Sequence, residues 1–90
     1  MKKIFVITYS GNNSADIEQA VKSFSSWFHF TKDVFLISED ATAKQIQSRL
    51  ETKILQGKEK LLVIEVEIKD VQGWLQKNEW DWLKSVRSQS

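Results

Sequence analysis

The chain has 90 residues, 13 basic and 12 acidic side chains, a formal net charge of +1, and no cysteine. This length accommodates one compact domain, and 41% hydrophobic residues can supply its core without a metal or a disulfide. The lack of cysteine excludes disulfides, thiol nucleophiles and cysteine-based zinc sites. The balanced charge neither favours nor excludes a nucleic-acid partner.

The apolar run near the N-terminus, residues 4–7, is too short for a signal peptide. No other run approaches the roughly 20 apolar residues of a membrane span. We therefore expect a cytoplasmic protein without a membrane partner.

The first expected element is a central strand at residues 4–9, because β-branched and aromatic residues occupy both of its faces. A polar loop follows, in which Asn13 or Ser14 can cap a helix. Apolar residues then recur every three or four positions, which predicts one buried helix face. These residues are Ile17, Ala20, Val21, Phe24, Trp27 and Phe28.

Two short β-prone runs, residues 28–30 and 34–37, flank a polar break and predict a hairpin, with one long bent strand as the alternative. Thr42 and Gln45 then match a capping box at the start of a second helix. Its expected buried residues are Ala43, Ile46, Leu50 and Ile54, with Gly57 just past its end.

The last strand is expected at residues 61–68, with Glu65 and Glu67 on its outer face. The resulting order predicts an α+β, ferredoxin-like βαββαβ fold with an antiparallel four-stranded sheet and two helices on one face. We expect a single domain, with a core at about 3–68 and a C-terminal tail at 69–90.

The other face of this sheet needs different cover. Depending on the register, that face carries Phe5 or Val6, Leu61 and Val63. The tryptophan-rich tail, in which Asn78 can cap a short helix, is expected to close it within one subunit or across a dimer. The apolar tail residues are Val71, Trp74, Leu75, Trp80, Trp82, Leu83 and Val86. The candidate partner or dimer surface consists of Trp74, Trp80 and Trp82.

The first strand ending at Tyr9, residues 26–29, 34–37 and 60–66, and the closing residues 81–84 form one pattern across most of the chain. This pattern resembles the CRISPR-associated Cas-two-like and VapD-like proteins, and more closely their small SinR-like relatives. The resemblance implies a ferredoxin-like homodimer, either a metal-dependent nuclease or a non-catalytic DNA-holding scaffold subunit. The nuclease members have an aspartate just after the first-strand tyrosine. This chain has Ser10 there, a poor magnesium ligand, so the nuclease role does not carry over.

Three polar features are candidate sites, and each also has a structural explanation. Free amides in the loop before the first helix can bind a phosphate, although capping and turn formation explain the same residues. Glu65 and Glu67, about 7 Å apart along a strand, can hold Mg²⁺ or Mn²⁺, although alternating charge on an exposed strand face is common. His29, the one histidine, could act as a general base only with an acid partner, which is not evident, so a structural or exposed strand residue is the better interpretation. The candidate nucleic-acid or anion contacts are Ser10, Gly11, Asn12, Asn13, Ser14 and Lys32.

No catalytic constellation is evident, so we expect a non-catalytic homodimeric binding or scaffold module without a cofactor, whose partner is nucleic acid or protein. One alternative is a metal-dependent endonuclease for RNA or DNA, with a non-standard carboxylate site drawn from Glu65, Glu67 or Asp16. Another is a phage or toxin–antitoxin accessory protein that acts through a protein partner. For the tail tryptophans, packing is favoured over base stacking.

Overall fold

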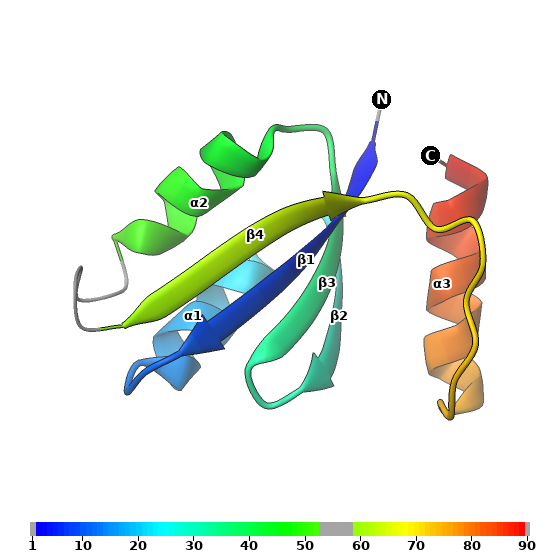
Figure 1. Ribbon diagram of the computed structural model, residues 1–90, viewed down its shortest axis with the longest axis horizontal. Coiled ribbons are helices and arrows are strands. Elements are labelled where there is room, and N and C mark those ends of the chain that lie inside the picture. Colours follow the sequence, from blue (N-terminus) through cyan, green and yellow to red (C-terminus); the bar gives the residue numbers. More distant parts are fainter. Residues whose placement is uncertain (1, 53–58, 90) are drawn as a thin grey trace.

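The computed structural model describes residues 2–52 and 59–89, with side chains described as far as residue 86. The fold is α+β, as predicted, with the elements in the order β1, α1, β2, β3, α2, β4, α3 (Figure 1). The strands are β1 (Lys3–Ser10), β2 (Ser26–Thr31), β3 (Val34–Glu39) and β4 (Lys60–Val66). The helices are α1 (Ser14–Lys22), α2 (Ala43–Glu51) and α3 (Lys77–Gln89).

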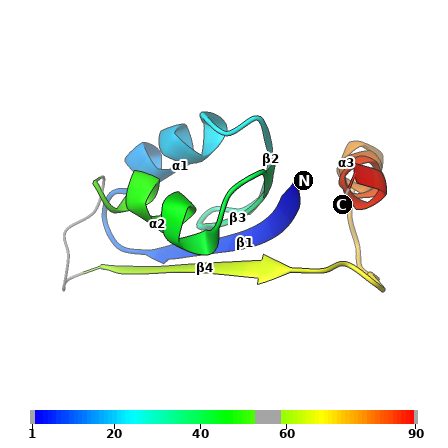
Figure 2. The ribbon, with the colours of Figure 1, turned by 90° about the horizontal axis from the view of Figure 1, so that it is seen from above.

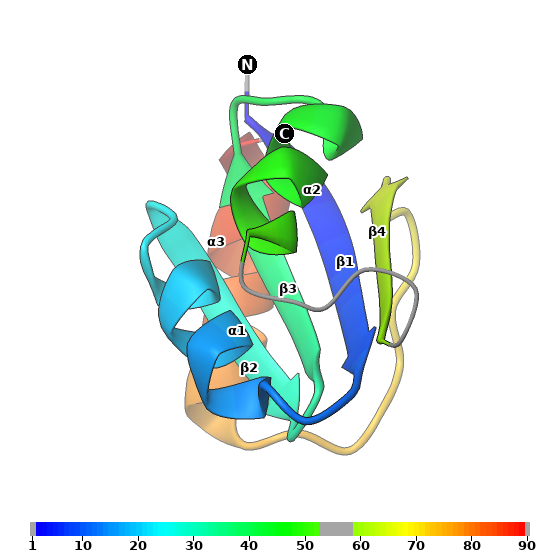
Figure 3. The same ribbon diagram turned by 90° about the vertical axis from the view of Figure 1, so that its left-hand side faces the viewer.

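The four strands form one antiparallel sheet in the order β2-β3-β1-β4. Viewed as in Figure 3, α1 and α2 lie in front of the sheet and α3 lies behind it. This arrangement is compatible with a small ferredoxin-like fold, and it confirms the predicted four-stranded antiparallel sheet.

The core lies between the sheet and the two helices α1 and α2. Since successive side chains of a strand point to opposite faces, Phe5, Ile7 and Tyr9 of β1 share the face toward these helices. Each large apolar side chain buried there stabilises the fold by about 1.5–3 kcal/mol. The cluster is completed by Ile17, Val21, Phe24, Phe35, Ile37, Ile46 and Leu50.

The first helix is shorter than the sequence pattern predicts. It ends at Lys22, and Trp27 and Phe28 belong to β2 instead. The hydroxyl of Ser23 donates to the carbonyl oxygen of Ala20 at 2.5 Å, and serine side chains of this kind compete with continued helix. The helical spacing of apolar residues from Ile17 to Phe28 therefore runs through three different elements, which are α1, a turn and the start of β2.

The predicted hairpin is present, although its first strand begins at Ser26 rather than at residue 28, and the second helix begins as predicted. β2 and β3 are separate strands that pair antiparallel, so the bent-strand alternative is wrong. The Thr42 hydroxyl accepts from the Gln45 amide at 3.2 Å, and the Gln45 side chain accepts from the Thr42 amide at 2.9 Å, which confirms the capping box. The predicted Ile54 and Gly57 lie outside the described residues.

The register of β4 corrects the prediction for its two faces. Tyr9 is opposite Leu61, Ile7 opposite Val63, and Phe5 opposite Glu65, so these β4 residues point to the helix-covered side rather than the other side. The strand ends at Val66, and Glu67 lies beyond it. The residues 61–64 are all apolar, and without alternation the sequence cannot define which of them faces the core.

Helix α3 lies beyond β2, on the side away from α1 and α2 (Figure 2). Leu83 and Val86 are buried, and the Trp82 ring meets Phe28 edge-on at 5.5 Å. The helix begins at Lys77, one residue before the predicted cap Asn78. Although α3 is the longest described helix, with 13 residues, neither it nor any other helix in the described ranges is long and apolar enough to cross a membrane.

Candidate functional site

The loop after β1 is joined to the start of β4 by the carboxylate of Glu59. Tyr9 Oη donates to Glu59 Oε1 at 2.6 Å and accepts from the Asn13 backbone amide at 2.6 Å. Asn13 Nδ2 donates to both Glu59 oxygens, at 2.8 and 3.0 Å, and the Asn12 amide donates to Oε1 at 3.3 Å. We call Tyr9, Asn12, Asn13 and Glu59 the Tyr9–Glu59 cluster.

Gly11 lies close to the side chains of this cluster. A Cβ atom at Gly11 would lie 2.5 Å from Tyr9 Oη and 2.6 Å from Glu59 Cγ, both shorter than any van der Waals contact. A larger residue at this position would therefore force the Tyr9 or Glu59 side chain to shift.

The phenol of Tyr9 is held in its neutral form. Burial raises the pKa of Tyr9, and the hydrogen bond to the Glu59 carboxylate raises it further. A neutral phenol can donate to Glu59 and accept from Asn13 at the same time, which is the arrangement observed.

The β2–β3 turn lies against the same loop. Ser14 Oγ donates to Asp33 Oδ1 at 2.8 Å, and the Tyr9 amide donates to the Asp33 carbonyl at 3.0 Å. The structure thus places the turn that carries Lys32 beside the loop after β1. This proximity is necessary if Lys32 and the loop are to contact the same anion. The structure also brings the carboxylates of Glu59 and Asp33 there, which sequence reasoning missed because an isolated acid beside a strand has no distinguishing pattern.

The anion contact in this loop stays a prediction. An approaching phosphate would meet two carboxylates, and the amides of Asn12 and Asn13 already donate to Glu59 and Tyr9. Of the predicted contacts, the exposed ones are Ser10, Gly11, Asn12 and Lys32, and the half-buried ones are Asn13 and Ser14.

The two glutamates considered as metal ligands do not lie together on one strand. Glu65 forms an ion pair with Lys3 at 3.7 Å, and Glu67 follows the end of β4. Within residues 2–52 and 59–89, no group of three or more histidine, aspartate or glutamate side chains is placed to hold a metal ion.

His29 has an acidic neighbour that the sequence did not reveal. Its Nδ1 lies 3.6 Å from Glu18, its Nε2 lies 3.0 Å from the Lys32 carbonyl, and its ring stacks on Phe35 at 4.4 Å. Glu18 also contacts Lys22 at 3.0 Å, and this hydrogen bond lowers the pKa of the carboxyl group. Since both ring nitrogens face acceptors within the protein, His29 connects α1 to the hairpin.

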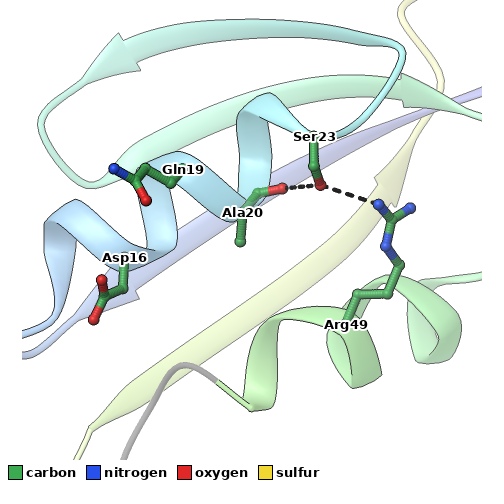
Figure 4. A pocket seen from close by; sticks show the side chains of 5 residues that line it. All are labelled: Asp16, Gln19, Ala20, Ser23 and Arg49. Atoms are coloured by element: carbon green, nitrogen blue, oxygen red, sulfur yellow. Dashed lines mark hydrogen bonds between the residues drawn. The ribbon is translucent and has the colours of Figure 1, made fainter.

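A groove of about 370 Å³ separates α1 from α2 (Figure 4). Arg49 crosses it, donating to Ser23 Oγ at 3.0 Å with its guanidinium 4.1 Å from the centre of the Phe24 ring. A cation at the C-terminal end of α1 stabilises the helix dipole. The groove thus holds a contact that joins the two helices.

The face of the sheet away from α1 and α2 carries a row of apolar side chains. The register aligns Phe28, Leu36, Val6 and Ile64 across all four strands. Phe28 is buried beneath α3, but exposure rises toward β4, reaching 44% for Ile64 and 54% for Leu62. We call Val6, Leu36, Leu62 and Ile64 the open strip, since α3 lies beyond β2 (Figure 2) and exposure of this face is highest at β4.

An apolar groove of about 260 Å³ lies where the segment before α3 passes over β2 and β3. The tryptophans differ in their surroundings: Trp82 donates from Nε1 to Ser26 Oγ at 3.0 Å, Trp80 is half-buried, and Trp74 is fully exposed at the groove. Sequence reasoning grouped them, but only Trp74 has its ring in solvent. The side chains that form the groove with it are Phe28, Phe30, Leu36, Leu75 and Leu83.

No protein-family model matches the chain, and no curated protein matches it. The geometry of the described residues is therefore the basis for a functional proposal. Its most distinctive features are the open strip and the apolar groove that adjoins it at Leu36.

Proposed function

We propose that this protein is a non-catalytic binding or scaffold module that acts as a homodimer, with the open strip as the surface shared by the two copies. The observation that carries the proposal is the exposure of Leu62 and Ile64 beside the half-buried Val6 and Leu36. Contiguous apolar surface that a monomer leaves in water marks an interaction site more often than chance.

A second copy is a suitable partner for this surface because sheets pack well face to face. Two antiparallel sheets stack about 10 Å apart, with the side chains of their facing surfaces interdigitated. Covering a half-exposed leucine or isoleucine contributes about 1 kcal/mol. Four such side chains, two from each copy, support association of the two sheets.

We also propose a specific core topology and a family relationship for this chain. The element order, with Tyr9 at the end of β1, supports a ferredoxin-like βαββαβ core with a C-terminal helical tail. It also supports kinship with the Cas-two-like, VapD-like and SinR-like proteins. Within that kinship Ser10 supports the scaffold role, since the nuclease members have an aspartate there. The proposed module acts in the cytoplasm and needs no cofactor.

Sedimentation velocity of the purified chain tests the dimer. We expect a mass of about 21 kDa, twice the 10.5 kDa of one chain. Ile64→Glu should give a monomer, because it places a charge at the centre of the interface. Gln19→Glu, which adds the same charge on the exposed surface of α1, should stay dimeric. A wild-type protein that remains monomeric at submillimolar concentration would contradict the proposal.

The nucleic-acid form of the module would use the loop after β1 and the neighbouring Lys32. Labelled duplex DNA and single-stranded RNA should then bind with an affinity that falls steeply with salt, because bound phosphates release counterions. At any one salt concentration, Lys32→Glu should bind these nucleic acids more weakly than wild type does. The absence of binding at low salt would contradict the nucleic-acid form and direct the search to a protein partner.

A further inference from the structure

Trp74 is the most exposed large apolar side chain in the described part of the molecule, with its ring entirely in solvent. A tryptophan ring offers one of the largest apolar surfaces of any residue, and leaving it in water forgoes the stabilisation that burial provides. The apolar groove lies directly beside it, lined in part by Phe28, Leu36 and Leu83. A projecting ring and an apolar recess thus occupy the same patch of surface.

We propose that this groove receives Trp74 of a second copy, so that two chains exchange their indole rings across a two-fold axis. The inference rests on the homodimer proposed above and names the contact that would fix its geometry.

The groove has the size and chemistry for this occupant. An apolar cavity of roughly 150 Å³ is enough to bind benzene, so about 260 Å³ accommodates an indole ring. Among the described residues that line it there is no charged side chain. A nucleic-acid backbone would find no counter-charge there, whereas an aromatic side chain needs none.

Two-fold symmetry requires that projection and recess lie on one surface. In an isologous interface, residue i of one copy contacts residue j of the other, and the reverse contact follows. Trp74 at the edge of the groove meets this condition. Leu36 belongs to both the groove and the open strip, so docking of Trp74 and contact between the strips involve one continuous surface.

The named contacts approach the area that a specific interface needs. Two tryptophan side chains bury roughly 300–500 Å² of their own surface. The grooves that receive them and the open strips bring the total toward the roughly 1,200 Å² at which stable specific interfaces begin.

The segment that carries Trp74 follows β4 without regular secondary structure. Its residues Val71, Gly73 and Leu75 line the groove beside Trp74, and a Cβ atom built at Gly73 would meet nothing within 4 Å.

Sedimentation velocity on two tryptophan variants tests the docking. Trp74→Ala should raise the dimer dissociation constant by at least about tenfold, as expected for a central aromatic anchor. Trp27→Ala is the matched control, because Trp27 is 38% exposed on the helix-covered side of the sheet, and it should leave the constant unchanged. If Trp74→Ala dimerises like wild type while Ile64→Glu does not, the docking is wrong and the homodimer stands. A wild-type monomer overturns both.

Isotope-filtered NMR distinguishes a Trp74 ring bound in the groove of a second chain from one bound in the groove of its own chain. In a mixture of unlabelled and methyl-labelled wild-type protein, we expect NOEs from the Trp74 indole of unlabelled chains to the Leu36 and Leu83 methyls of labelled chains. The Trp74→Ala variant should lack them. NOEs found only within a chain would show that Trp74 closes its own groove, which overturns the proposal.

Discussion

Glu59 organises more of the local structure than any residue the sequence singled out. Its carboxylate accepts from Tyr9, Asn12 and Asn13, and these bonds draw the loop after β1 toward β4. Asn13 occupies the position before α1, but its side chain makes no capping bond and donates to Glu59 instead. A long-range partner has therefore replaced the local cap that the sequence favoured.

Gly11→Ala should destabilise the protein by about 1–3 kcal/mol, because the new methyl group displaces Tyr9 or Glu59 and leaves partly buried polar atoms without partners. Urea denaturation measures the change in the free energy of unfolding. Gly73→Ala is the matched control, since its methyl group meets no neighbour, and we expect a change within about 0.5 kcal/mol. Equal effects at the two glycines would contradict the close-approach explanation.

Tyr9 should also produce a pH dependence of stability. Its pKa is raised above the ordinary value of 10.0, so on folding the neutral phenol is favoured. The resulting stabilisation is complete below pH 10 and is lost as the pH rises through the higher folded-state pKa. The free energy of unfolding of wild type should therefore fall more steeply above pH 10 than that of Tyr9→Phe.

The measurement is direct because Tyr9 is the one tyrosine of the chain. Phenolate absorbance, followed as the pH is raised beyond 10, reports its ionisation, and urea denaturation at each pH gives the stability of both proteins. A Tyr9 pKa at or below 10, or parallel stability curves for wild type and Tyr9→Phe, would refute the coupling.

Among the elements, α2 was the easiest to predict because its start depends on neighbouring residues alone. Thr42 and Gln45 are three positions apart, and their reciprocal bonds form in any chain that turns into a helix there. The end of α1 was harder to predict because Trp27 and Phe28 continue the helical spacing of apolar residues. Pairing of β2 with β3 overrides that local preference, and pairing across the chain is not visible in a local pattern.

Thr42→Ala should cost about 1 kcal/mol of stability, since it removes the side-chain acceptor for the Gln45 amide. Thr42→Ser retains an acceptor and should cost much less. Thermal unfolding followed by circular dichroism compares the two. Equal losses would show that the threonine methyl group, rather than the cap, accounts for the effect.

For the molecule as a whole, the sequence predicted the α+β class and the four-stranded sheet from the spacing of its apolar residues. It could not predict which surface stays uncovered, because that depends on the β4 register and on where α3 lies. Trp74 and Trp82 look alike in sequence, yet one is in solvent and the other packs on Phe28. Only the assembled fold distinguishes a packing tryptophan from an exposed one.

The Tyr9–Glu59 cluster resolves an ambiguity that the apolar run of β4 leaves open. A shift of β4 by one residue would reverse its faces and bring Leu61 and Val63 outward, and a shift by two would preserve the faces. The two-residue shift would still carry Glu59 about 6–7 Å along the sheet, away from Tyr9 and Asn13. One carboxylate at the head of the strand thus favours the observed alignment of β4 over both shifted ones, and in this alignment Leu62 and Ile64 are exposed.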